Sequence, residues 1–177
     1  VNGVYQGASF AFREGFSSGI LRMIWGSDAS MFVGMTSRGW SSTGKENFGL
    51  QRLVWTGKMP FEIKTIKALA DGFEVEFTKP VSKQLAENTS SYKLATFTYH
   101  YHNTYGSPIV DQQGAMIHAA KLSEDGKKVK LTIHGMRLGF IHQLNCSGVK
   151  TISGESLLHD TGFYTLNEVP GGELKSP

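Results

Sequence analysis

The chain contains a single cysteine, Cys146, among its 177 residues. An intrachain disulfide needs two cysteines, and a cysteine-based zinc site also needs more than one, so both are excluded. A lone thiol within an apolar stretch is typical of a small buried residue. The Cys-x-x-Cys-His motif that attaches haem is also missing, so this part of the protein is not a c-type cytochrome.

Long hydrophobic runs and a strong charge imbalance are absent as well. No apolar run approaches the ~18 residues of a transmembrane helix, so we expect no membrane span. The net charge is +3, and the lysines are scattered instead of forming a basic stripe, so the sequence gives no support to nucleic-acid binding. Val1 is preceded by neither an initiator Met nor a signal peptide, so we expect the chain to begin inside a longer or processed polypeptide.

Helical periodicity is nearly absent from the sequence. Short apolar runs bounded by Gly, Ser, Asp and Asn dominate instead, and these runs are typical of strands. The 21 glycines and the charged fraction of 19% fit frequent turns between such strands. The sequence therefore predicts an all-β fold.

Residues 1–57 contain four candidate strands, at residues 5–12, 20–25, 31–35 and 50–56. Four consecutive antiparallel strands with loops of these lengths form one blade of a β-propeller. A single blade cannot bury both of its faces by itself. We therefore predict a terminal propeller blade, which is an incomplete domain that needs neighbouring blades.

The apolar and polar positions alternate more cleanly beyond residues 57–60, where we place a domain boundary. In residues 73–77, Phe and Val alternate with Glu, which is typical of a strand with one buried face and one wet face. About seven short strands of this kind predict an immunoglobulin-like β-sandwich over residues 61–169. Residues 170–177 are rich in Gly and are expected to be a linker or tail.

Residues 19–34, with the sequence GILRMIWGSDASMFVG, resemble a blade of the glucose/sorbosone dehydrogenase-type β-propellers. In that family the blade reads as Arg, two apolar residues, Gly-x-Asp-Gly, and then apolar residues before Val-Gly. Ala29 stands where the family usually has glycine. Residues 36–40 and 49–57 resemble the loop and the strand that follow. The resemblance implies a parent protein that is a sugar oxidoreductase using pyrroloquinoline quinone (PQQ) and calcium.

The rest of the chain resembles the immunoglobulin-like modules that bacteria append to secreted proteins. The resemblance is carried by residues 73–81, 91–94, 122–131 and 140–149. It implies a secreted or periplasmic location. The two resemblances together imply that the chemistry lies elsewhere in the parent protein, so we assign no catalytic residue here and expect the remaining blades as partners.

Three residues are candidates for binding a cofactor. In a blade, the loop before the first strand and the loop after the second emerge on one rim, where functional residues commonly lie. These loops, at residues 13–19 and 36–49, carry Arg13, Arg38 and Trp40. An arginine fork suits the carboxylates of a quinone cofactor. In the alternative interpretation, Arg38 pairs locally and Trp40 packs between blades.

A His-x-His pair is the candidate metal site. His100 and His102 lie two residues apart on a predicted strand, so both rings project from one face. Two imidazoles can hold zinc or copper when a third ligand is near, and His118 or Asp111 could supply it. The alternative is an ordinary solvated polar face.

The aromatic residues around this pair suggest a second use. On the opposite face of the strand, Phe97, Tyr99 and Tyr101 are predicted to be in the core. Aromatic rings with adjacent imidazoles can also stack on sugar rings and bind their hydroxyl groups. The candidate ligand-binding residues are Tyr99, His100, Tyr101, His102 and Tyr105.

Two main functions follow from these features. We expect a non-catalytic C-terminal fragment of a secreted sugar-dehydrogenase-like propeller protein, which provides structural closure and docking. The alternative is a carbohydrate-binding or adhesion module that uses residues 99–105. A third hypothesis is a small metal-binding domain centred on His100 and His102.

Overall fold

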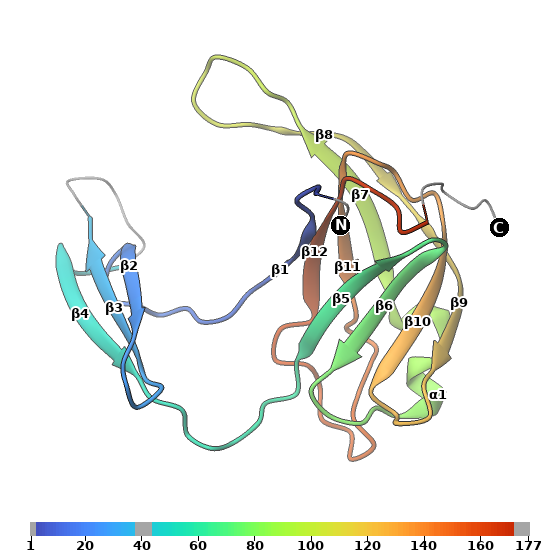
Figure 1. Ribbon diagram of the computed structural model, residues 1–177, viewed down its shortest axis with the longest axis horizontal. Coiled ribbons are helices and arrows are strands. Elements are labelled where there is room, and N and C mark those ends of the chain that lie inside the picture. The colour runs from blue at the N-terminus through green and yellow to red at the C-terminus, as the bar shows by residue number, and fades with distance from the viewer. Residues whose placement is uncertain (1–2, 38–43, 172–177) are drawn as a thin grey trace. The chain divides into compact units, whose positions relative to one another are not determined.

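The computed structural model describes residues 3–37 and 44–171, and the regular secondary structure of these residues is almost entirely β (Figure 1). They form three antiparallel sheets, which confirms the predicted all-β class. The elements in chain order are β1 (Gly7–Phe10), β2 (Ile20–Trp25), β3 (Met31–Thr36), β4 (Phe48–Leu53), β5 (Ile63–Leu69), β6 (Gly72–Phe77), α1 (Lys83–Ala86), the 3-10 turn η1 (Thr89–Ser91), β7 (Lys93–Tyr99), β8 (Ile109–Gly114), β9 (Met116–Leu122), β10 (Lys128–His134), β11 (Phe140–Asn145) and β12 (Thr161–Leu166).

The chain forms two units, and the smaller one is inserted in the sequence of the larger one. The larger unit comprises Val1–Ala11 and Pro60–Pro177, and the smaller comprises Phe12–Met59. Strand β1 precedes the insertion but belongs to the larger unit, where it pairs antiparallel with β12. This pairing corrects the predicted blade of residues 1–57. Its first strand lies in the sandwich, and in the described residues the sheet of the smaller unit has the order β2-β3-β4.

The larger unit is a sandwich of two antiparallel sheets. One sheet has the strand order β1-β12-β11-β7-β8, and the other has the order β5-β6-β10-β9. The chain passes from β8 in the first sheet to β9 in the second within a few residues, so one edge of the sandwich is covalently closed (Figure 1). Of the predicted tail, residues 172–177 lie outside the described residues.

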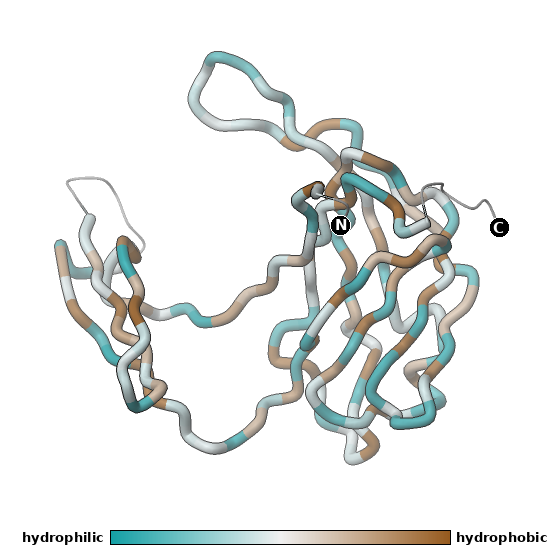
Figure 2. Tube along the Cα trace, in the orientation of Figure 1, coloured by the Kyte–Doolittle hydropathy of each residue, from teal (hydrophilic) through white to brown (hydrophobic). Residues whose placement is uncertain are grey.

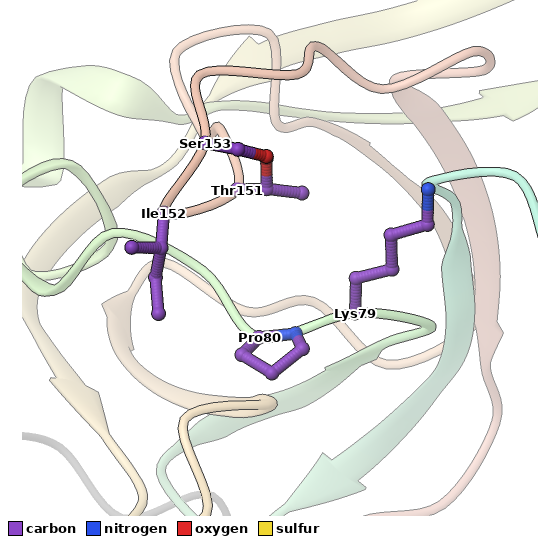
Figure 3. Close-up of a pocket in the computed structure, with 5 residues that line it drawn as sticks. All are labelled: Lys79, Pro80, Thr151, Ile152 and Ser153. Atoms are coloured by element: carbon purple, nitrogen blue, oxygen red, sulfur yellow. The ribbon is translucent and has the colours of Figure 1, made fainter.

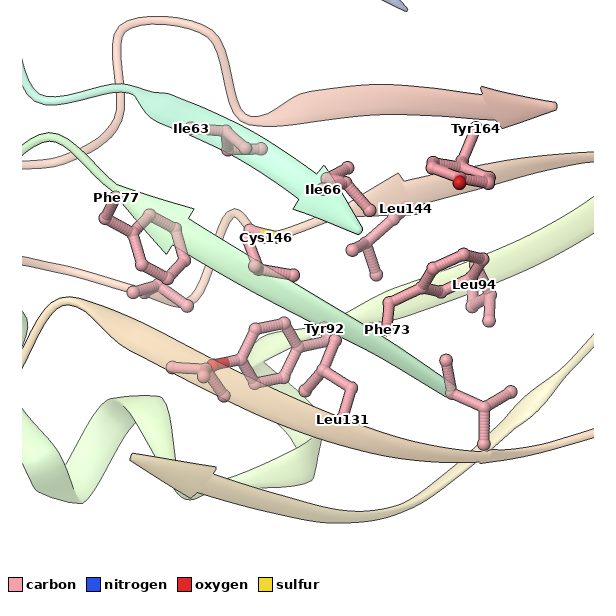
Figure 4. Close-up of a cluster of buried hydrophobic side chains, with 14 of the residues drawn as sticks. Ile63, Ile66, Phe73, Phe77, Tyr92, Leu94, Leu131, Leu144, Cys146 and Tyr164 are labelled. Carbon is pink, nitrogen blue, oxygen red and sulfur yellow. The ribbon is translucent and has the colours of Figure 1, made fainter. Parts of the chain in front are cut away.

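The core lies between these two sheets and follows from the alternation of apolar residues. Phe73, Val75 and Phe77 on β6 are fully buried, and the glutamates between them face outward. Leu144 and Tyr164 approach from the opposite sheet (Figure 4). Full burial of one large apolar side chain contributes about 1.5–3 kcal/mol, so this alternating pattern accounts for much of the stability of the sandwich.

Gly72 marks a place where two backbones come unusually close. It begins β6 and pairs with Thr132 of β10. A Cβ atom at Gly72 would lie 1.9 Å from the carbonyl oxygen of Leu131, and the backbone at Gly72 has φ +155°. Glycine is therefore required at this position, because any side chain would push the two central strands apart.

Replacement of Gly72 by alanine tests this close approach. The clash involves backbone atoms that cannot move aside, so Gly72→Ala should lower the free energy of unfolding by about 2 kcal/mol or more. The matched control is Gly114→Ala on β8, where a Cβ atom would meet nothing within 4 Å. Urea unfolding of both variants makes the comparison. Equal stabilities would show that β6 and β10 are not as close as described.

No helix in residues 3–37 and 44–171 has the length and apolar character that a membrane span requires.

Candidate functional site

The inserted sheet carries large apolar side chains that are exposed to solvent. Every residue of β2 is exposed, and Figure 2 shows hydrophobic residues along the sheet. In β3, by contrast, Val33 and Met35 are buried. The exposed large apolar residues of β2 and β4 are Ile20, Leu21, Met23, Ile24, Trp25, Phe48 and Leu50.

These side chains are distributed over both faces of the sheet. Ile24 pairs with Phe32, and Leu50 pairs with Gly34 two residues further along β3, so Ile24 and Leu50 share one face. Trp25 follows Ile24 directly in the strand and therefore projects from the other face. Ile24 is 70% exposed, Leu50 71% and Trp25 67%. Exposed apolar patches on both faces of one sheet are typical of a surface that packs against other protein domains.

The turn between β2 and β3 is built around Asp28. Its carboxylate accepts hydrogen bonds from the backbone N–H of Ser30 at 3.1 Å and from the Ser30 hydroxyl at 2.6 Å. Arg52 on β4 forms an ion pair with the same carboxylate. The Ser30 hydrogen bonds, aided by Arg52, lower the pKa of Asp28 to about 2. Asp28 thus joins the turn to the edge strand and has a structural role.

Ala29 in this turn has a backbone conformation that glycine normally adopts. Its φ is 61°, in the left-handed region that side chains disfavour. The backbone N–H of Gly26 donates to the carbonyl of Ser30 at 2.7 Å, which closes the turn over this residue. The geometry of the turn therefore calls for glycine where this chain has alanine.

Of the three predicted cofactor-binding residues, the described part of the chain includes Arg13. Arg13 is exposed in the segment between β1 and β2. Arg38 and Trp40 lie outside the described residues, so their placement beside Arg13 stays a prediction.

The loop between β7 and β8 carries the predicted ligand-binding residues and extends away from the sandwich (Figure 1). Phe97 is buried as predicted, but β7 ends at Tyr99, which is half-exposed. Tyr101 and Tyr105 are fully exposed. The prediction that Tyr101 lies in the core is wrong, because the chain leaves the sheet before this residue and the alternation ends there.

The His100 and His102 rings do lie on one side of this loop. They stack with 5.2 Å between their centroids and 24° between their planes. The Nδ1 atom of His102 accepts a hydrogen bond from the backbone N–H of Thr104 at 3.1 Å, so one of its nitrogens is already occupied.

Neither predicted third ligand for a metal reaches this pair. Asp111 forms an ion pair with Arg137, and His118 packs against His134. Within residues 3–37 and 44–171, no three His, Cys, Asp or Glu side chains are grouped as a metal site. The metal hypothesis for His100 and His102 therefore lacks the third ligand on which it depended.

A surface hollow of about 350 Å³ lies at one end of the sandwich (Figure 3). Its lining residues are Lys79, Pro80, Thr151, Ile152 and Ser153. Lys79 Nζ donates to both carboxylate oxygens of Glu155, at 2.9 and 2.8 Å. The hydroxyls of Thr151 and Ser153 bind each other at 2.9 Å. The polar groups here satisfy one another instead of pointing at a common ligand.

His142 is a buried histidine that the sequence analysis did not single out. Its Nε2 accepts from the backbone N–H of Arg137 at 3.2 Å, which leaves Nδ1–H to donate to the carbonyl of Phe140, also at 3.2 Å. Burial lowers the pKa of His142 to about 4, and the charge of Arg137 acts in the same direction. The imidazole is therefore neutral near pH 7 and is part of the packed core.

The Cys146 thiol is also buried, and this burial raises its pKa. Because the thiol stays protonated, it is a poor nucleophile.

Comparisons with known proteins find similar solved structures but no matching family model or curated sequence. No protein family model matches the chain, and no curated protein sequence matches it. Among solved structures, the N-terminal part of the bacterial S-layer protein SbsC is similar, with a TM-score of 0.47 and 21% identity over 63% of this chain and 25% of that chain.

Two longer SbsC structures show the same likeness. The surface layer protein SbsC, domains 1–6, has a TM-score of 0.46, and rSbsC(31-844) has a TM-score of 0.47. Each is 21% identical, over 63% and 62% of this chain respectively, and this chain spans 14% of each. The chain thus spans a quarter or less of these proteins, and the likeness carries no inference about function.

The buried His142 predicts a specific dependence of stability on pH. Its pKa is about 4 in the folded chain and 6.5 as the ordinary value, so the unfolded chain binds more protons between these pH values. Above pH 6.5, the neutral imidazole makes its full contribution to the free energy of unfolding. As the pH falls towards 4, this contribution is lost, and the loss is about 3 kcal/mol in total.

Two variants isolate this contribution. His142→Gln and His142→Leu both remove the titrating group, so both should lose this slope, whatever their absolute stability. The free energy of unfolding, measured in urea from pH 4 to 8, gives the slopes. If both variants kept the slope of the parent chain, His142 would not be its source.

Proposed function

We propose that this chain is a non-catalytic part of a secreted, sugar-dehydrogenase-like propeller protein. In this proposal the sheet β2–β4 serves as a propeller blade, and the sandwich is a structural and docking module. The proposal rests on the exposed apolar side chains on both faces of the inserted sheet. A blade packs against a neighbour on each side, so it needs two apolar faces, whereas a sheet on a protein surface needs only one.

The turn between β2 and β3 supports the same assignment. The propeller blades that this sequence resembles carry Gly-x-Asp-Gly here, and this chain has Gly26, Asp28 and then Ala29. The φ of 61° at Ala29 explains why glycine is usual at that position. The hydrogen bonds of Asp28 explain the aspartate, because they organise the turn and tie it to β4 through Arg52.

The partners of the chain in this proposal are the remaining blades of the parent protein. PQQ and calcium belong to the parent, where the sugar substrate is oxidised. The parent reading frame tests this directly. Repeated blade motifs upstream of Val1 are expected, whereas a stop codon just before Val1 would contradict the proposal.

The two apolar faces predict how the isolated chain behaves in solution. Without neighbouring blades, the chain should self-associate and bind a fluorescent hydrophobic dye. The variants Ile24→Thr/Leu50→Thr on one face and Met23→Thr/Trp25→Ser on the other should each reduce association and dye binding, because each removes one apolar surface.

The matched control for these variants is Ile152→Thr. Ile152 is 77% exposed but lies in the sandwich unit, so this change should leave association and dye binding as they are. Analytical ultracentrifugation measures the association. A parent chain that is monomeric and binds no dye would show that the inserted sheet is not an unpartnered blade.

A carbohydrate-binding role is a second candidate, favoured by the exposure of the β7–β8 loop. Tyr101 and Tyr105 are fully exposed, and in the same loop the His100 and His102 rings stack on each other. Tyrosine rings stack on the apolar faces of sugars, and imidazole nitrogens bind hydroxyl groups.

Affinity electrophoresis on polysaccharide gels tests this role. Tyr101→Ala and Tyr105→Ala should each weaken retardation by about tenfold, which corresponds to the loss of one aromatic contact of about 1.4 kcal/mol. The control is Tyr5→Ala, because Tyr5 is equally exposed but lies outside the loop. Retardation that is absent in the parent chain, or unchanged in both loop variants, would exclude the loop as a sugar site.

A further inference from the structure

The edge hairpin β9–β10 brings two histidines and a methionine onto one outer face. Met116 begins β9 and is the cross-strand partner of His134, which ends β10. Cross-strand partners project from the same face of a sheet, with their Cβ atoms about 5 Å apart. Leu131 and Ile133 point into the core, so His134 and its partner Met116 face outward.

A β-bulge adds His118 to the same face. Ile117 pairs with Ile133, and Ala119 pairs with Thr132. Thr132 and Ile133 are consecutive in β10, so His118 is the extra, bulged residue of β9. Bulges re-aim a side chain, and here the His118 ring lies edge-on to the His134 ring, with 5.6 Å between centroids and 76° between planes. The two imidazoles and the thioether therefore gather at one place on the surface.

All three side chains are accessible and free to adjust. Met116 is 63% exposed, and both histidines are exposed. Within the described residues, neither imidazole makes a hydrogen bond, and the side chains of His118 and His134 interact through the edge-on contact of their rings. Exposed side chains of this kind change rotamer readily, so ring nitrogens and sulfur can converge on one ion.

The chemistry of these donors selects a particular metal. A thioether is a soft ligand that favours Cu(I), whereas imidazole alone serves zinc, nickel and copper alike. Zinc sites use Cys, His, Asp and Glu and are mostly four-coordinate, which this trio does not provide. We propose that Met116, His118 and His134 form a surface binding site for Cu(I).

The site is tested on the whole chain by anaerobic titration of Cu(I) against a chromophoric competitor such as bicinchoninate. The parent chain should bind one Cu(I) at this site. Met116→Leu and His134→Gln should each weaken that binding by about tenfold or more. Both positions are exposed, and circular dichroism of each variant establishes that the fold is retained.

Two controls distinguish this site from metal binding by histidine side chains alone. Met116→Leu should leave Ni(II) binding unchanged, because nickel does not depend on the thioether. His100→Gln/His102→Gln removes the stacked pair of the β7–β8 loop, which has two imidazoles without a thioether, and should leave the Cu(I) affinity as it is. The proposal is overturned if the parent chain binds no Cu(I), if Met116→Leu binds it as tightly as the parent, or if the loop variant loses it.

Discussion

The two sheets of the sandwich meet at Phe73. Its ring lies 5.1 Å from the ring of Tyr164 and 5.4 Å from that of His142, and both of these belong to the opposite sheet. Gly72, next to it, allows β6 to lie close to the backbone of Leu131 in the neighbouring strand β10 of the same sheet. His142 must stay neutral to occupy this place, since a charged imidazole would be buried against apolar rings. The hydroxyl of Tyr164 in turn accepts a hydrogen bond from Gln6, just before β1. One inter-sheet contact thus links the packing, the acid sensitivity and the anchoring of the N-terminal strand.

The inserted sheet differs from the sandwich because, in the described residues, it is not packed against a second sheet. Large apolar side chains of β2 and β4 are exposed on both faces, whereas Val33 and Met35 of β3 are buried. The chain leaves the sandwich after Ala11 and returns at Pro60, so the insertion is joined to the larger unit by two covalent connections. A sheet of this kind contributes little burial to its own stability and gains it from a partner. This difference between the two units is the physical basis for our proposal that the insertion serves as a blade and the sandwich as a structural and docking module.

Several features of the candidate sites were readable from the sequence, and others were not. The exposure of both faces of β2 has a local signal, because Met23, Ile24 and Trp25 are consecutive, and consecutive residues in a strand point to opposite faces. Tyr101 was misplaced because alternation predicts burial only while a strand continues, and β7 ends at Tyr99. The meeting of His118 with His134 depends on a bulge, and a one-residue change of register has no signature in composition. The burial of His142 likewise depends on which sheet covers its strand.

The sequence by itself determined the class of the fold and the core face of the central strands. Alternation of apolar and polar residues in β6 and β10 acts over a few residues, and it specifies which side chains turn inward wherever the strands end up. Tertiary structure alone decided that Gly7–Phe10 pairs with β12, across an inserted unit and nearly the whole chain. The hydrogen-bonding edge of a strand is the same for every partner, so the choice among partners depends on the packing of the completed sandwich. The same reason applies to the Met116, His118 and His134 group, whose members become neighbours only when β9 and β10 adopt their final register.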